Sequence, residues 1–256
     1  MTSQYFPTHG KTGCRICFPR GQSVVTNGPW TTRNDPGHWG SCNPRLLVLG
    51  FSKGKTQADS YANGAFDEVA FDRMRDRLAL VLQTLGLLKS YENINSKFRP
   101  DEKDFAFASL VRCSLVRQGS TSGALVVRAF EEAQALGFVQ TCSTRFLGTL
   151  PERLRLVLML GTNDRYIEHA RELIRSLHPG VTQFNPVAYG DSKVLWVHVA
   201  HPSRANGHLK EWLSGDPAKS RPAGKRELAK QAISLACEVD SLNAGVTFPP
   251  AAVTSW

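Results

Sequence analysis

One histidine and one pair of cysteines stand out as residues that could do chemistry. His201 ends the apolar run "VLWVHVA" at residues 194–200 and is followed by Pro202, which disfavours a helix at this point. A lone histidine after an apolar strand is more often a hydrogen-bonded core residue, but the polar turn that follows favours a place at the mouth of a pocket. Cys14 and Cys17, with two residues between them, could bind a metal or a cluster, do redox chemistry, or stand together by chance.

The other cysteines and the position of the pair say little about which of these roles Cys14 and Cys17 have. The chain has six cysteines, and in a reducing compartment they are not expected to form disulfides. Redox chemistry is the weaker alternative for Cys14 and Cys17, because the pair precedes the first recognisable strand instead of lying between a strand and a helix. Cys42 and Cys237 are interpreted as core or surface thiols.

Composition bounds the class of protein. The 256 residues are 41% hydrophobic, which is enough for one substantial core, so we expect a single domain over residues 1–256. A formal net charge of +9 favours a polyanionic partner, DNA or RNA. No apolar stretch approaches the ~20 residues of a membrane span, and the N-terminus lacks the apolar segment of a signal peptide. We therefore expect a cytoplasmic monomer with no membrane association and no nucleotide cofactor.

Four short apolar runs alternate with segments of helical periodicity. The runs predict buried strands at residues 45–50, 107–111, 154–161 and 194–199. Apolar residues at helical spacing predict helices over residues 69–85, 125–136, 164–177 and 228–242. This alternation predicts an α/β fold, a three-layer α/β/α sandwich around a central, mostly parallel four-stranded sheet.

The connecting segments have their own compositions. Within an N-terminal segment of residues 1–44, residues 18–44 are rich in Gly, Pro, Asn and Thr and predict an ordered loop. Residues 214–226 predict a flexible basic connector, and residues 227–256 a C-terminal helix and tail.

Three polar turns directly follow predicted strands. They are "GFSKG" at 50–54, "GTND" at 161–164 and "HPSRAN" at 201–206. Ligands of parallel sheets gather beyond the carboxyl ends of the strands. We therefore expect the three turns to border one crevice.

The order of these motifs resembles the uracil-DNA glycosylase superfamily, most closely its iron-sulfur branch, often called family 4. Five features follow one another between about residues 13 and 213: a CxxC pair, a strand ending in a GxxxG turn, a phenylalanine, two later cysteines, and a strand leading into HPS. The HPS motif alone is moderately specific, and its combination with the cysteine order is much more so. The resemblance implies an enzyme that flips a nucleotide out of DNA and hydrolyses its N-glycosidic bond.

In the iron-sulfur branch four cysteines bind a 4Fe–4S cluster. Their counterparts in this sequence are Cys14, Cys17, Cys113 and Cys142. Thiolates are the ligands that such a cluster requires, and zinc is the less favoured alternative. The gap between Cys113 and Cys142 is longer than the resemblance leads us to expect, and an inserted helix over residues 121–138 would account for it.

The resemblance places Gly50 and Gly54 at the turn glycines of the motif that positions the attacking water. The residues between them depart from the family: Phe51 stands where the iron-sulfur branch has Glu, and Ser52 where other branches have Asp or Asn. Lys53 replaces the usual proline. We expect Phe51 to border the base, Ser52 to orient water without being an unaided general base, and Lys53 to contact DNA.

Three further residues are expected near the base. Phe66 in "NGAFDEV" matches the phenylalanine that stacks on the flipped base. Ser109 occupies the position of the asparagine that reads the pyrimidine, and a serine cannot supply the paired donor and acceptor of an amide. Asp59 is a nearby carboxylate that could assist catalysis, or could be a turn residue or solvated charge.

The resemblance assigns the turn after the fourth strand to the leaving base and to DNA. His201 matches the histidine that donates a hydrogen bond to the departing base. Ser203 would contact a backbone phosphate, while Arg204 and Asn206 lie where the family inserts a loop into the duplex.

Two kinds of function follow. The first is a DNA glycosylase that excises uracil or a modified pyrimidine and leaves an abasic site, with the bulky hypermodified bases of phage DNA as an alternative substrate. Repair and defence against phage are both compatible with it. The second is a non-catalytic DNA-binding protein of the same fold, which the missing Glu and Asn favour. RNA binding has only the net charge in its favour.

Overall fold

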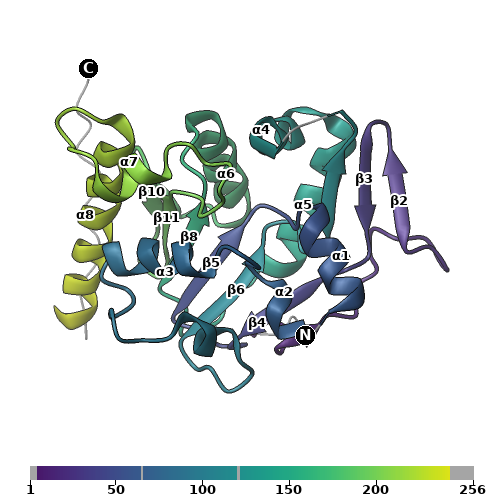
Figure 1. Cartoon of the computed structure of the whole chain (residues 1–256), viewed down its shortest axis with the longest axis horizontal. Coiled ribbons are helices and arrows are strands. Elements are labelled where there is room, and N and C mark those ends of the chain that lie inside the picture. Colours follow the sequence, from purple (N-terminus) through teal and green to yellow (C-terminus); the bar gives the residue numbers. More distant parts are fainter. Residues whose placement is uncertain (1–4, 65, 120–121, 243–256) are drawn as a thin grey trace.

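A computed structural model describes residues 5–64, 66–119 and 122–242 of the chain. At its centre lie four parallel strands, which are the four that the apolar runs predicted. They are β5 (Leu46–Gly50), β6 (Phe105–Ser109), β8 (Leu156–Leu160) and β11 (Leu195–Val199). Their order is β6-β5-β8-β11, and each strand hydrogen-bonds in parallel with its neighbour (Figure 1).

The sheet is wider than predicted, because short antiparallel strands extend both edges to a total of eight among the described residues. β4 (Gly37–Gly40) and β1 (Gly10–Lys11) continue the sheet beyond β6. β10 (Ala188–Gly190) and β9 (Thr182–Asn185) continue it beyond β11. The prediction of four strands is therefore wrong in number. These edge strands have two to four residues, which is too short for a recognisable apolar pattern.

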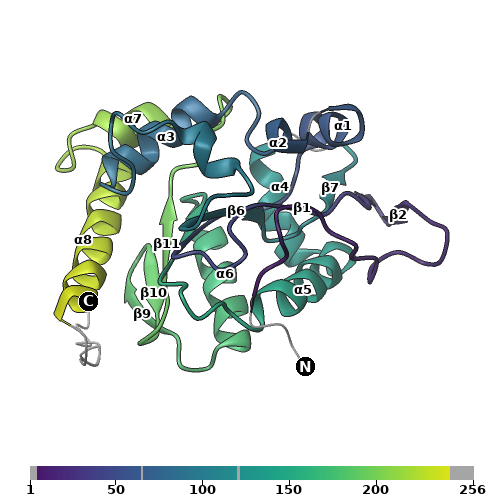
Figure 2. The ribbon, with the colours of Figure 1, turned by 90° about the horizontal axis from the view of Figure 1, so that it is seen from below.

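Helices cover both faces of the sheet (Figure 2). Successive residues of a strand point to opposite faces, so Val48 of β5 packs in one apolar core while Leu47 and Leu49 pack in the other. The first core includes residues of α3 (Arg75–Thr84), α7 (Leu209–Ser214) and α8 (Arg221–Leu242). The second includes residues of α4 (Ser122–Glu131), α5 (Ala133–Leu147) and α6 (Asp164–Leu177). The predicted α/β class is confirmed.

The single helix predicted over residues 69–85 is interrupted. α2 (Phe66–Val69) ends in a turn, and α3 begins only at Arg75. Within the turn Phe71 and Arg73 have φ angles of 57° and 55°, a left-handed conformation that is rare for residues other than glycine. The apolar spacing continues through the turn, so the sequence pattern does not reveal it.

The segment predicted as a loop over residues 18–44 instead contains strands. β2 (Val24–Asn27) and β3 (Trp30–Arg33) form a hairpin that pairs with β7 (Ser114–Arg117) in a second, three-stranded sheet (Figure 1). Gly28 is the first of the two turn residues and has a φ of 56°, as this kind of hairpin requires. The turn dipeptide Gly-Pro was the signal that could have revealed the hairpin.

The C-terminal boundaries also differ from the prediction. α8 begins at Arg221, not at residue 227, so half of the predicted flexible connector is helical. The side chain of Arg226 is buried and donates to the carbonyl oxygens of Trp212 at 3.0 Å and Gly215 at 3.2 Å. This basic residue therefore fastens α7 to α8. Residues 243–256 and the side chain of Cys237 lie outside the described part of the chain.

Three shorter features complete the description. The helix predicted over residues 121–138 corresponds to α4 and the first part of α5, which meet at Glu132. α1 (Lys55–Asn63) follows β5, and a 3-10 helix spans Ile94–Phe98. Within the described residues no helix has the length and apolar character needed to cross a bilayer.

Candidate functional site

A pocket lies at the carboxyl ends of β5 and β6, where the sequence predicted a crevice. Five predicted site residues line it, namely Gly50, Ser52, Lys53, Ser109 and His201. The other lining residues are Trp39, Gln57, Ala70, Phe71, Met74 and Ala108. His201 and the turn after β5 therefore face a single cavity, as the sequence interpretation required. This cavity is called the β5 pocket below.

Hydrogen bonds around His201 fix the orientation of its ring and the nitrogen that carries the proton. Nδ1 accepts a hydrogen bond from the backbone N–H of Ser203 at 3.1 Å, and the side-chain amide of Asn206 donates to the carbonyl oxygen of His201 at 2.8 Å. Because Nδ1 is an acceptor, the proton of the neutral ring is assigned to Nε2. Burial lowers the pKa of His201 to about 4. Near pH 7 the residue is therefore a neutral donor through Nε2–H.

The register of the sheet brings Ser109 beside Gly50. The two residues are Cα partners at the ends of β6 and β5, and the hydrogen bonding continues beyond them from the N–H of Leu110 to the carbonyl oxygen of Gly50 at 2.8 Å. A Cβ on Gly50 would lie 3.9 Å from the hydroxyl of Ser109. A glycine and a short hydroxyl side chain therefore form this part of the β5 pocket lining.

Phe51 and Lys53 do not occupy the surroundings predicted for them. Phe51 is buried in the core on the other face of the sheet, where its ring contacts those of Phe130 and Tyr166. Neighbouring positions of an extended chain point to opposite sides, so Phe51 faces away when Ser52 lines the pocket. The structure contradicts the predicted contact of Phe51 with a base. Lys53 is only 3% exposed and donates to the carbonyl oxygen of Arg112, which contradicts its predicted contact with DNA.

Two further predicted site residues, Gly54 and Asp59, do not belong to the pocket lining. Gly54 is exposed at the start of α1, with open space where a side chain would project, so no close approach of the backbone requires glycine there. The carboxylate of Asp59 is half-exposed on α1 and accepts a hydrogen bond from Nη1 of Arg33 at 2.9 Å. This placement does not support the catalytic role predicted for Asp59.

The aromatic residues at the pocket differ from the one predicted. Phe66 does not line the β5 pocket, because its ring stacks on Trp39 with a centroid distance of 4.6 Å and an interplanar angle of 6°. Trp39 and Phe71 line the pocket in its place, and sequence reasoning missed both. Trp39 belongs to the short edge strand β4, and Phe71 occupies the left-handed turn after α2.

The "GTND" turn after β8 lies apart from the β5 pocket. Asp164 at the start of α6 accepts hydrogen bonds from Lys225 at 2.6 Å and from Arg221. Lys225 also donates to the carbonyl oxygen of Thr162 at 2.6 Å. The turn therefore fastens α8 to the sheet, and the expectation that all three turns border one crevice is wrong for this one.

The "HPSRAN" turn contains residues of different character. Arg204 is exposed, and among the described residues no ion pair engages its guanidinium. Ser203 is half-buried with its backbone N–H bonded to His201. Asn206 uses its side chain to close the turn onto the carbonyl oxygen of His201. Arg204 is thus the member of this turn that is free to reach a phosphate.

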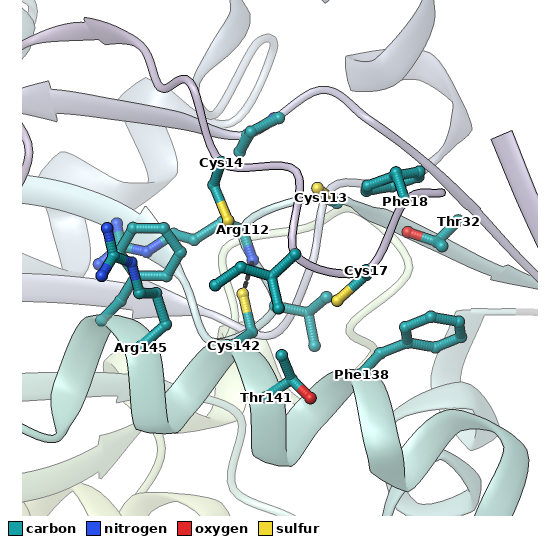
Figure 3. A pocket seen from close by; sticks show the side chains of 14 residues that line it. Cys14, Cys17, Phe18, Thr32, Arg112, Cys113, Phe138, Thr141, Cys142 and Arg145 are labelled. Atoms are coloured by element: carbon teal, nitrogen blue, oxygen red, sulfur yellow. Dashed lines mark hydrogen bonds between the residues drawn. The ribbon is translucent and has the colours of Figure 1, made fainter. Parts of the chain in front are cut away.

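A second cavity is lined by all four cysteines that the resemblance grouped together (Figure 3). Cys14 and Cys17 come from the N-terminal segment, Cys113 from the loop between β6 and β7, and Cys142 from α5. The Sγ atom of Cys142 accepts a hydrogen bond from the backbone N–H of Arg112 at 3.1 Å, drawn in Figure 3. Three distant parts of the chain therefore present thiols to one space, called the cysteine cavity below.

Buried positive charge lies beside the cysteine cavity. Arg112 is 1% exposed, and its Nε and Nη2 atoms have no hydrogen-bond partner among the described residues. Buried Lys53 lies 3.8 Å from a carboxylate oxygen of Asp35, which also accepts from the backbone N–H of Ser114. Lys53 therefore has a buried carboxylate beside it, whereas no ion pair with a described residue engages Arg112. A buried cation without a compensating anion is costly.

The thiols themselves favour the protonated form when nothing is bound. Burial raises the pKa of Cys113 to about 12 and that of Cys142 to about 11, and it also raises the pKa of Cys17. A metal ion reverses this preference because it stabilises the thiolate. Within the described residues no three His, Cys, Asp or Glu side chains are grouped closely enough to hold a single metal ion.

The two cavities share a wall. Lys53 lines the β5 pocket, and its ammonium group reaches the carbonyl oxygen of Arg112, whose side chain lines the cysteine cavity. Residues 110–113 connect Ser109 of one cavity to Cys113 of the other. The linings of the two cavities are therefore joined by a short stretch of the chain.

No model of a protein family matches this chain, and no curated protein does. An assignment of function therefore depends on the chemistry of the two cavities.

Proposed function

We propose that the protein is a DNA glycosylase that takes an everted, modified pyrimidine nucleotide into the β5 pocket and hydrolyses its N-glycosidic bond. The observation that carries the proposal is the convergence of His201, Ser52 and Ser109 on one cavity at the carboxyl ends of β5 and β6. Aromatic surfaces of Trp39 and Phe71 in the same cavity suit a flat base.

Departure of the base is the step that this pocket favours. Cleavage of the N-glycosidic bond leaves negative charge on the base, and a preorganised donor in a water-poor site stabilises that charge. Nε2–H of His201 is such a donor and needs no proton exchange near pH 7.

Attack by water has weaker support from the side chains. None of the residues lining the β5 pocket, all within the described part of the chain, is an Asp or Glu. Ser52 can orient a water molecule but is no base by itself. We therefore assign most of the rate to stabilisation of the leaving base, and little to activation of water.

The inner end of the pocket bears on the choice of base. Ser109 offers one hydroxyl where an amide would read a pyrimidine edge with a donor and an acceptor together. Gly50 and Ala108 leave space beside it. We therefore propose a pyrimidine with an added substituent, including a bulky base of phage DNA, as a substrate beside uracil.

The cysteine cavity supports a structural 4Fe–4S cluster as the cofactor. The four thiols line one space, and a cluster with four thiolates would supply the anion that buried Arg112 lacks. A single zinc ion would need sulfurs about 3.8 Å apart at the vertices of a tetrahedron. A 4Fe–4S cluster instead takes each thiolate on a different iron. When bound, it would hold the N-terminal segment against α5.

DNA is the proposed partner. The formal net charge of +9 favours a polyanion, and exposed Arg204 lies three residues after His201. Phosphate contacts next to the pocket would offset the few kcal/mol that eversion of a nucleotide costs. A protein that binds DNA without cleaving it is the second candidate, because the pocket lining has no carboxylate.

The two candidates are separated by a panel of duplexes that contain uracil, hydroxymethylated or glucosylated pyrimidines. Alkali-labile abasic sites in any of them, with the strand intact before alkali, would support the glycosylase. Tight retention of DNA with no abasic sites in the whole panel would overturn the glycosylase and support the binder. Unmodified duplex is the control for background cleavage.

A further inference from the structure

Two turns that are distant in the sequence contribute to the wall of the β5 pocket. The turn between α2 and α3 contributes Ala70, Phe71 and Met74, and the turn after β11 contributes His201. Neither turn is part of the sheet, so strand register does not set the distance between them. The contacts that join the two turns therefore determine the width of the pocket.

Arg77 of α3 makes such a contact. Its Nε donates to the carbonyl oxygen of Pro202 at 2.5 Å, and its Nη2 donates to the carbonyl oxygen of Arg73 at 2.8 Å. One planar guanidinium group thus holds both backbones at once, which an ammonium group cannot do with the same geometry. Among the described residues no ion pair draws Arg77 away from these two carbonyls.

The turn on one side of this clamp is under strain. Phe71 and Arg73 both have left-handed backbone conformations, which persist where the surroundings fix them. Arg75 holds the turn from within its own segment, by hydrogen bonds to the carbonyl oxygens of Ala70 at 3.0 Å and of Asp67. Arg77 extends this support across the pocket to the turn that carries His201.

We infer that Arg77 is a positioning residue that sets the distance between Phe71 and His201, and with it the fit of an everted base between them. The inference rests on the proposed function for its catalytic consequence, but it concerns the shape of the pocket itself. Without the clamp the His201 turn is free to move outward. A displacement of about 1 Å at a reacting group can lower a rate on the order of 100-fold.

The test compares Arg77→Lys and Arg77→Gln with a matched control, Arg153→Gln. Arg153 also joins two backbone segments, because its Nη1 donates to the carbonyl oxygens of Asn43 at 3.3 Å and Lys103 at 3.2 Å. It precedes β8, so it lies at the end of the sheet opposite the pocket. The control removes a clamp of the same kind where no base would bind.

The first readout is release of the base under single-turnover conditions. We expect both Arg77 variants to release the base about 10- to 100-fold more slowly, with DNA affinity changed less than about threefold. Arg153→Gln should match the wild type in both quantities. An Arg77→Gln protein as fast as the wild type, or an Arg153→Gln protein as slow as the Arg77 variants, would overturn the inference.

The second readout needs no catalysis. NMR follows the titration of His201, whose signal is assigned by its loss in His201→Gln. Burial holds the pKa of this residue at about 4 in the wild type, and Lys53 is the charged side chain that shares the pocket lining. Arg77→Lys keeps the positive charge and breaks the clamp, so we expect water to enter and the pKa to rise toward 6.5.

The two readouts separate this inference from the proposed function. If the pKa of His201 rises in Arg77→Lys while the wild type releases no base from any duplex, the clamp is supported and the glycosylase function is contradicted. An unchanged pKa of His201 in Arg77→Lys would overturn the clamp even if the wild type releases base.

Discussion

The β5 pocket and the cysteine cavity lie on either side of one short segment, residues 110–113, yet their charge differs. The β5 pocket is lined by hydroxyl groups, aromatic rings and a histidine that is neutral near pH 7. The cysteine cavity lies against a fully buried arginine whose guanidinium has unpaired nitrogens. Under the proposed function, the first would accept negative charge as it forms and then release it, whereas the second would hold an anion permanently. The first would then be a site for a transient group and the second a site for a resident one.

The largest effect is expected where the resident anion would be lost. Cys142→Ser removes a buried thiol of the cysteine cavity, and we expect purified protein to lose bound iron, its brown colour and its absorbance near 400 nm (about the range for thiolate-ligated iron). Cys42→Ser is the matched control, because Cys42 does not line the cavity. Equal iron content in Cys142→Ser and the wild type would contradict the proposed cluster. Stoichiometric zinc in the purified wild type would show a zinc site in place of the cluster.

Arg112→Met tests the same cavity through the sign of a stability change. If a thiolate cluster compensates Arg112, removing the cation leaves buried negative charge, and we expect the free energy of unfolding to fall by about 3–5 kcal/mol. If the cavity holds no anion, removing an unpaired buried cation should stabilise the protein instead. Urea unfolding of iron-loaded protein, with the exposed Arg204→Met as control, distinguishes the two signs.

A smaller effect is expected from the histidine of the β5 pocket. The folded pKa of His201, about 4, is below the unfolded value of 6.5, so the folded state binds fewer protons between these pH values. Stability is therefore complete above pH 6.5 and falls as the pH drops toward 4, by at most about 3 kcal/mol for this residue. His201→Gln should lose this share of the acid sensitivity, measured as the change in urea midpoint between pH 7.5 and 5.

The core of the fold follows from sequence because long apolar runs specify buried strands without help from neighbours. The four parallel strands were predictable in this way, and the bounds of α6 were predictable from its helical spacing. The edge strand that carries Trp39 and the turn that carries Phe71 were not, since one is too short to show a period and the other interrupts a helical pattern that continues past it. For this reason the sequence did not predict Trp39 and Phe71, the two aromatic residues of the pocket.

The two cavities differ in the same respect. The resemblance to the iron-sulfur branch grouped the four cysteines that line one cavity before any coordinates were known. In the β5 pocket the direction of each side chain decides its role. Phe51 and Ser52 are neighbours in the sequence, yet Phe51 packs in the core on the opposite face of the sheet while Ser52 lines the pocket. Lys53 illustrates a further difficulty, because its partner Asp35 lies in a segment with no readable pattern.

The most direct test of the account is the single-turnover rate at which His201→Ala releases free base from a duplex that the wild type cleaves, measured by mass spectrometry beside His208→Ala. His208 is an exposed histidine of the same segment and does not line the β5 pocket. We predict a rate about 100- to 1000-fold lower for His201→Ala with DNA affinity preserved, and no change for His208→Ala. Release by His201→Ala at the wild-type rate would contradict the account.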